Sequence, residues 1–144
     1  MVCTFFGNRD TPDSIRPKLE ELLRALIEQQ GVTQFYVGHQ GSFDRMVESM
    51  LKALKKEYPH IHYSVVLAYL PLSAKADDMI DYSETIFPDG MEKSPPRFAI
   101  DKRNRWMIQK SDMAITYVRN PFGNAAKYKA IAERKRLQII ELAN

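Results

Sequence analysis

The pattern that most constrains the fold of this chain is an alternation of short apolar runs with longer stretches of helical periodicity. Runs that begin near positions 2, 35 and 65 are apolar throughout, which is typical of strands buried on both faces of a parallel sheet. The pattern predicts strands at Val2–Phe6, Phe35–Val37, Val65–Leu70, Glu84–Phe87, Met113–Val118 and Gln138–Leu142. Strands that alternate with helices favour a doubly wound α/β fold, with a mainly parallel sheet of five or six strands and helices on both faces.

Helical periodicity fills the stretches between most of these runs. Apolar residues recur there at intervals of three and four, so we expect helices at about Leu19–Ile27, Phe43–Leu54, Arg97–Lys110 and Ala125–Lys135. Residues 71–97 break the rhythm, because they hold four prolines, several acidic residues and only one short strand candidate. Such a long connection is often a lid or a binding loop, and an incidental surface excursion is the other interpretation.

Composition places the chain among globular proteins. Its 144 residues, 44% hydrophobic and 27% charged, fit one domain spanning 1–144. No apolar run approaches the length of a membrane span, and the N-terminal stretch lacks the features of a signal peptide. A lone cysteine, Cys3, excludes an internal disulfide and favours a buried structural thiol in a cytoplasmic protein. The three histidines lack the spacing of a zinc site, so we expect no metal.

Charge is unevenly distributed along the chain. Residues 97–144 carry eleven lysines and arginines against four acids, whereas residues 1–96 carry ten against fourteen. A basic segment of this kind is either a solvated face or part of a site for an anionic ligand, and charge alone does not choose between them.

The loops that follow strands form the candidate site, because ligands of open α/β sheets bind beyond the carboxyl ends of strands, where the strand order reverses. The first such loop contains Gly7, Asn8 and Arg9. Glycine permits a close backbone approach, and arginine is a bidentate donor suited to phosphate. A plain strand-to-helix turn is the alternative interpretation.

The second loop combines two glycines with the start of a helix. Its candidates are Gly38, Gln40, Gly41 and Asp44, and its amides can face an anion. Asp44 falls in the first helical turn, where it either contacts a ligand or meets the free amides of the helix. His39 in the same loop is either an acid–base group or simply exposed.

The third loop again joins a strand to a helix, and its candidates are Phe122, Gly123, Asn124 and Lys127. Small residues there leave room for a ligand on the helix N-terminus. Arg103 and Asn104 complete the set, since a guanidinium supplies charge and an amide supplies both a donor and an acceptor. The chain has neither the three-glycine dinucleotide fingerprint nor a Walker-type lysine motif.

Three of these motifs together resemble the SMF/DprA–Lonely Guy group of Rossmann-like proteins, called the SLOG superfamily. They are Gly7-Asn8-Arg9, the glycine-rich turn from Gly38 to Asp44, and Phe98 with Arg103-Asn104-Arg105 and Ser111-Asp112. Short bacterial families of the YpsA-like kind are the most similar. The resemblance implies a Rossmann-like fold that binds a nucleotide or a nucleotide-derived ligand, such as an ADP-ribose-like molecule, with no resident cofactor.

One departure from the resembled group bears on catalysis. Lonely Guy enzymes carry a catalytic glutamate after their glycine-rich turn, whereas this chain has lysines, Lys127 and Lys129, where that acid is sought. We therefore expect a sensor-type binding module more than an enzyme, and in the group's manner a homo-oligomer without a membrane contact.

Two other functions stay open. The first is a nucleotide N-glycosidase or phosphoribohydrolase-type hydrolase, with Asp44 or an acid of the 71–97 connection as its base. The second is single-stranded nucleic-acid binding, suggested by the basic C-terminal segment with Trp106, Tyr117 and Tyr128. It is not favoured, because these aromatic residues alternate with apolar residues at spacings typical of a core.

Overall fold

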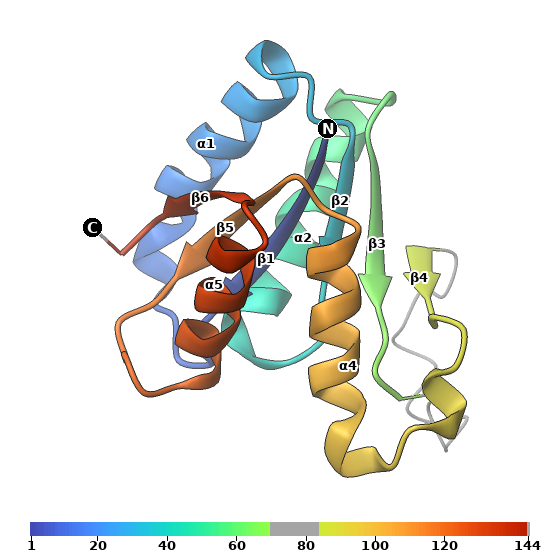
Figure 1. Cartoon of the computed structure of the whole chain (residues 1–144). Helices are drawn as coiled ribbons and strands as arrows, with labels where there is room; N and C mark the ends of the chain where they lie inside the picture. The colour runs from blue at the N-terminus through green and yellow to red at the C-terminus, as the bar shows by residue number, and fades with distance from the viewer. Residues whose placement is uncertain (70–83, 144) are drawn as a thin grey trace.

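The computed structural model describes residues 1–69 and 84–143 of the chain (Figure 1). Six strands form one sheet in which every neighbouring pair is parallel, in the order β4-β3-β2-β1-β5-β6. The strands are β1 Val2–Gly7, β2 Gln34–Val37, β3 His62–Val66, β4 Thr85–Ile86, β5 Met113–Tyr117 and β6 Gln138–Glu141. The predicted α/β fold with a parallel sheet is confirmed.

Four α-helices cover the sheet in the described part of the chain: α1 Arg16–Gln29, α2 Gly41–Glu57, α4 Pro96–Gln109 and α5 Asn124–Arg134. Short 3-10 turns, η1 Asp13–Ile15 and η3 Met91–Lys93, precede α1 and α4. Proline in the first turn of α1 and of α4 sets the backbone angle for a helix start and has no N–H to lose there. All four predicted helices are confirmed, with ends that shift by a few residues.

The helices lie on both faces of the sheet, as a doubly wound fold requires. Successive side chains of a strand point to opposite faces. In β1, Cys3 and Phe5 therefore pack with the buried residues of α1 and α2, whereas Phe6 packs with those of α4 and α5. Figure 1 shows α4 and α5 together on one face and α2 on the other. Burial raises the pKa of the Cys3 thiol, as expected of a structural cysteine.

Strand β3 differs from its predicted range. It begins at His62, three residues before the apolar run, and ends at Val66. The polar residues His62 and Ser64 pair with Gln34 and Tyr36 of β2, so the ladder extends beyond the part that hydrophobicity reveals. Leu70, the last residue of the predicted strand, and residues 71–83 of the predicted irregular connection lie outside the described residues.

The strand order reverses at β1. Strand β1 pairs with β2 on one side and with β5 on the other, and the chain continues outward from both. Ligands of parallel sheets bind at such a switch point, beyond the carboxyl ends of the strands. Gly7, the last residue of β1, stands level with Tyr117, the last residue of β5. No helix in the described ranges has the length and apolar character needed to cross a membrane.

Candidate functional site

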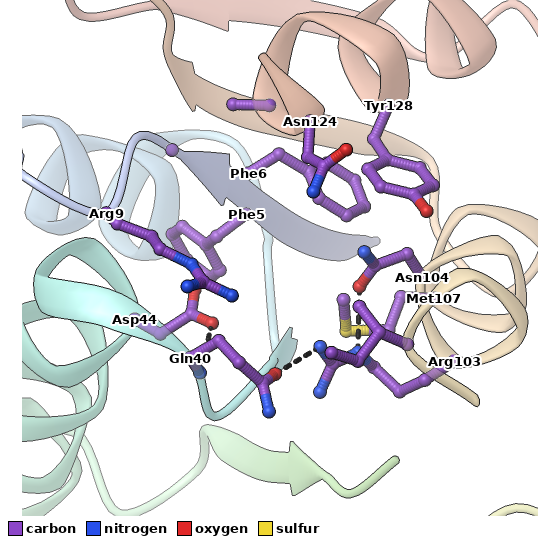
Figure 2. A pocket seen from close by; sticks show the side chains of 13 residues that line it. Phe5, Phe6, Arg9, Gln40, Asp44, Arg103, Asn104, Met107, Asn124 and Tyr128 are labelled. Carbon is purple, nitrogen blue, oxygen red and sulfur yellow. Dashed lines mark hydrogen bonds between the residues drawn. The ribbon is translucent and has the colours of Figure 1, made fainter. Parts of the chain in front are cut away.

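A cavity of about 90 Å³, here called the inner cavity, opens where β1 and β2 end and where α2, α4 and α5 approach one another (Figure 2). Residues of all three helices and of the loop after β1 line it: Phe5, Phe6, Gly7, Arg9, Gln40, Asp44, Ile100, Arg103, Asn104, Met107, Asn124, Ala125 and Tyr128. A second space of about 290 Å³, here called the middle cavity, adjoins it and shares Gly7, Arg9, Asn124 and Ala125 with it. The two cavities lie at the switch point of the sheet.

Arg103 braces the wall of the inner cavity. This α4 side chain is only 2% exposed, and each of its nitrogens donates a hydrogen bond within the protein. Nε donates to Asn104 Oδ1 at 2.8 Å, Nη1 donates to the Val66 carbonyl at 2.9 Å, and Nη2 donates to Gln40 Oε1. Burial lowers the pKa of its guanidinium. Arg103 thus ties α4 to the ends of β2 and β3 and orients two amide side chains that line the cavity.

Asp44 is the carboxylate of the inner cavity. Its Oδ2 accepts the backbone N–H of Gln40 at 2.9 Å. Burial raises its pKa to about 6, despite that hydrogen bond and the positive charge of Arg103. Both charged groups lie against Gly38. A Cβ at this position would lie 2.9 Å from Asp44 Oδ2 and 3.1 Å from Arg103 Nη1. Gly38 does not line the cavity, but only glycine leaves space for both groups.

Asp44→Asn is expected to change the pH dependence of stability. The pKa of Asp44 in the folded state is above its ordinary value of 3.8, so the unfolded chain releases this proton at a lower pH than the folded protein does. The free energy of unfolding of the wild type therefore falls as pH rises from about 4 to 6. Well above pH 6 the variant should exceed the wild type in free energy of unfolding by about 3 kcal/mol, and at about pH 3, below both pKa values, the difference should vanish. Urea denaturation at both pH values measures it. An equal difference at both would contradict the titration of Asp44 as its cause.

Arg9 is a cavity cation whose guanidinium has no partner among residues 1–69 and 84–143. Its backbone carbonyl accepts hydrogen bonds from the N–H and the Oγ of Ser42, at 2.9 and 2.6 Å, and these hold the start of α2 against the loop after β1. Gly41 is needed there, since its φ is +81° and a Cβ would lie 2.9 Å from Arg9 Cα. The Arg9 side chain lines both cavities and has no hydrogen bond or ion pair within the described residues (Figure 2).

Tyr128 of α5 forms the wall opposite Gln40. Its ring stacks on Phe6 with centroids 5.6 Å apart, and its hydroxyl donates to Asp101 Oδ1 at 2.8 Å. Burial, followed by that bond to Asp101, raises its pKa to about 12, so the hydroxyl stays protonated. Lys127 forms an ion pair with the same carboxylate, because its Nζ lies 3.3 Å from Asp101 Oδ1.

The structure brings most of the sequence-predicted site residues together. Those that line the inner or the middle cavity are Gly7, Asn8, Arg9, Gln40, Asp44, Arg103, Asn104, Gly123 and Asn124. Gly38 and Gly41 lie behind this lining, in the positions described above. Phe122 is 95% exposed and, like Lys127, lines neither cavity. His39 is also outside, where Glu48, with an oxygen 3.6 Å from Nδ1, raises the pKa of its imidazole.

Sequence reasoning missed the apolar part of the lining, including Phe6, Ile100, Met107 and Tyr128. A signal for three of them existed in the helical period. Ile100 and Met107 lie one turn to either side of the Arg103-Asn104 pair, and Tyr128 lies one turn after Asn124. Such residues are hard to tell from core residues, because both kinds are apolar and repeat at the same spacing.

No protein-family model matches this chain, and a search of curated proteins found no match either. Within the described ranges, no group of three or more histidine, cysteine, aspartate or glutamate side chains is placed to hold a metal ion. The polar groups that line the inner cavity are guanidinium, amide, carboxyl and phenol groups.

Proposed function

We propose that this protein binds a phosphate-bearing nucleotide, or a ligand derived from one, in the inner and middle cavities. The observation that carries the proposal is the free guanidinium of Arg9, which lines both cavities beside the N-terminal end of α5. The N-cap residue of α5, Gly123, has no side chain to cap the first amides, and the side chain of Gln40, the N-cap of α2, makes no cap hydrogen bond. Helix N-termini favour anions, and an unpaired arginine beside them suits a phosphate group.

The other lining groups suit the remainder of a nucleotide. Gln40, Asn104 and Asn124 offer amides, which are both donors and acceptors and can read a base or a sugar. Phe6 and Met107 supply apolar surface beside them. The inner cavity, at about 90 Å³, is far below the roughly 300–1,000 Å³ of common ligand pockets, so only one group of the ligand fits there. The rest of the ligand belongs in the middle cavity.

The resemblance to the SLOG superfamily supports the same proposal. Its motif residues Arg9, Asp44, Arg103 and Asn104 lie around the inner cavity. The buried, unpaired Cys3 thiol suits a reducing compartment, so we place this binding function in the cytoplasm.

Calorimetric titration with the four ribonucleoside 5′-monophosphates tests the proposal. Arg9→Ala is expected to weaken the affinity for the bound nucleotide about tenfold or more, because a hydrogen bond between charged groups contributes about 1.5–3 kcal/mol. Arg134→Ala is the matched control, since it removes one exposed arginine from the other end of α5. Absence of binding at millimolar nucleotide, or equal losses in the two variants, would overturn the proposal.

A hydrolase is the second candidate function, and Asp44 is the observation that favours it. A carboxyl whose pKa is about 6 can exchange a proton near neutral pH, as a general acid or base must. Release of free base from nucleoside 5′-monophosphates would support hydrolysis of the N-glycosidic bond. Binding without release over hours at high protein concentration would leave the binding function alone.

A further inference from the structure

A third cavity continues the site along the carboxyl edge of the sheet. It encloses about 350 Å³ between the loop after β1 and the ends of β5 and β6, and is here called the outer cavity. It shares Asn8 and Asp10 with the middle cavity, which in turn shares Gly7 and Arg9 with the inner one. The three spaces therefore adjoin one another in a row across the switch point.

We propose that this row takes a ligand with two separated phosphate groups, of the dinucleotide class, with one phosphate at Arg9 and the other at Arg119. The inference rests on the proposed function, since it extends the same site. It concerns the size and charge pattern of the ligand, which the inner and middle cavities alone do not define.

Arg119 gives the outer cavity a second free cation. Its guanidinium lies over the Tyr117 ring, 5.8 Å from the centroid, and has no hydrogen bond or ion pair within residues 1–69 and 84–143. Its backbone N–H donates to Asn8 Oδ1 at 2.8 Å. This bond holds the loop after β5 against the loop after β1. The two free arginines are thus presented from neighbouring loops that are tied to each other.

Asp10 explains why the two phosphates should be separated. This exposed residue lines both the middle and the outer cavity, and its carboxylate has no ion pair among the described residues. A carboxylate repels a phosphate but accepts hydrogen bonds from sugar hydroxyls. The order of groups along the row is therefore cation, carboxylate, cation, which matches phosphate, sugar, phosphate.

Three buried residues support the outer cavity beneath its polar lining. Ile15, Tyr117 and Leu142 line it, and each is less than a tenth exposed. At about 350 Å³, the outer cavity has room for a second nucleoside unit.

Calorimetry with three probes tests the inference: AMP, ADP with adjacent phosphates, and the 5′-phosphorylated dinucleotide pApA with separated phosphates. The wild type is expected to bind pApA at least about tenfold more tightly than AMP, the effect of one added charged contact. In Arg119→Ala that gain should be lost, so that pApA and AMP bind equally. The control Arg134→Ala should keep the gain.

Several results would overturn the inference. They are a wild type that binds pApA no better than AMP, a gain that persists in Arg119→Ala, and an equal gain with ADP. Longer oligoadenylates, of up to about eight nucleotides, extend the test: an affinity that grows steadily with their length would also overturn the inference, because it would indicate single-stranded nucleic-acid binding. If AMP binds and is sensitive to Arg9→Ala, the proposed function stands even when the inference fails. If neither these probes nor any of the four ribonucleoside 5′-monophosphates binds, the proposed function itself fails.

Discussion

Replacing Gly7 by alanine is expected to lower the free energy of unfolding by about 3 kcal/mol, because it overpacks the core. A Cβ at Gly7 would lie 2.3 Å from Cγ and 2.4 Å from Cδ2 of Phe43, far inside van der Waals contact. Phe43 is 1% exposed, so its ring is enclosed by the protein. Either α2 or the end of β1 must therefore move. Urea denaturation monitored by circular dichroism measures the loss.

A double-mutant cycle isolates the cause. Phe43→Ala removes Cγ and Cδ2, the two atoms nearest to the added Cβ, so Gly7→Ala should cost much less in that background than in the wild type. Gly123→Ala is a matched control with ordinary φ, −87°, whose Cβ would meet only the movable Asn120 side chain at 3.3 Å. We expect it to change the free energy of unfolding by less than about 0.5 kcal/mol. Equal costs of Gly7→Ala in both backgrounds would contradict this explanation.

The second large effect is expected for Arg103→Ala, which should destabilise the fold by about 3 kcal/mol and lower the melting temperature by about 10 °C. The variant leaves the Val66 carbonyl without its donor and opens a void where a large buried side chain was. It also frees Gln40 and Asn104, so the affinity for nucleotide should fall as well. Scanning calorimetry measures the melting temperature.

Arg105→Ala is the control for Arg103→Ala, since it removes the same side chain from the same helix. Arg105 is exposed and pairs with Asp101 at 2.9 Å. Exposed pairs of this kind contribute less than about 1 kcal/mol, so its melting temperature should stay within a few degrees of the wild type. A melting temperature of Arg103→Ala as high as that of Arg105→Ala would show that Arg103 is not the brace described above.

Most of the fold could be predicted from the sequence, because each element carries a local signal. The runs at Phe35–Val37 and Met113–Val118 are almost entirely apolar, which favours strands covered on both faces. The start of β3 could not be predicted, because His62 and Ser64 are polar and belong to the strand only through their pairing with β2. Strand order is likewise a tertiary property, and no local pattern encodes it.

The site could be predicted in part, because the switch-point rule selects loops by their place in the topology. The switch-point rule predicts Arg9, Gln40 and Asn124 as site residues, and all three line the inner cavity. It could not separate Arg9 from Arg103. The two are alike in sequence, but one is free and the other donates three hydrogen bonds, a difference that depends on how α4 approaches β3. It also gave no sign that Lys127 is occupied by Asp101.

The position of β1 at the switch point has a consequence for synthesis on the ribosome. The chain makes the centre of its sheet first, but one neighbour of β1 arrives more than a hundred residues later, when Val2 meets Asp112 and Cys3 pairs with Met113. At about 5–20 residues per second, one edge of β1 stays open for on the order of ten seconds. An unpaired apolar strand is a template for aggregation. The nascent chain is therefore expected to depend on chaperone protection until β5 emerges.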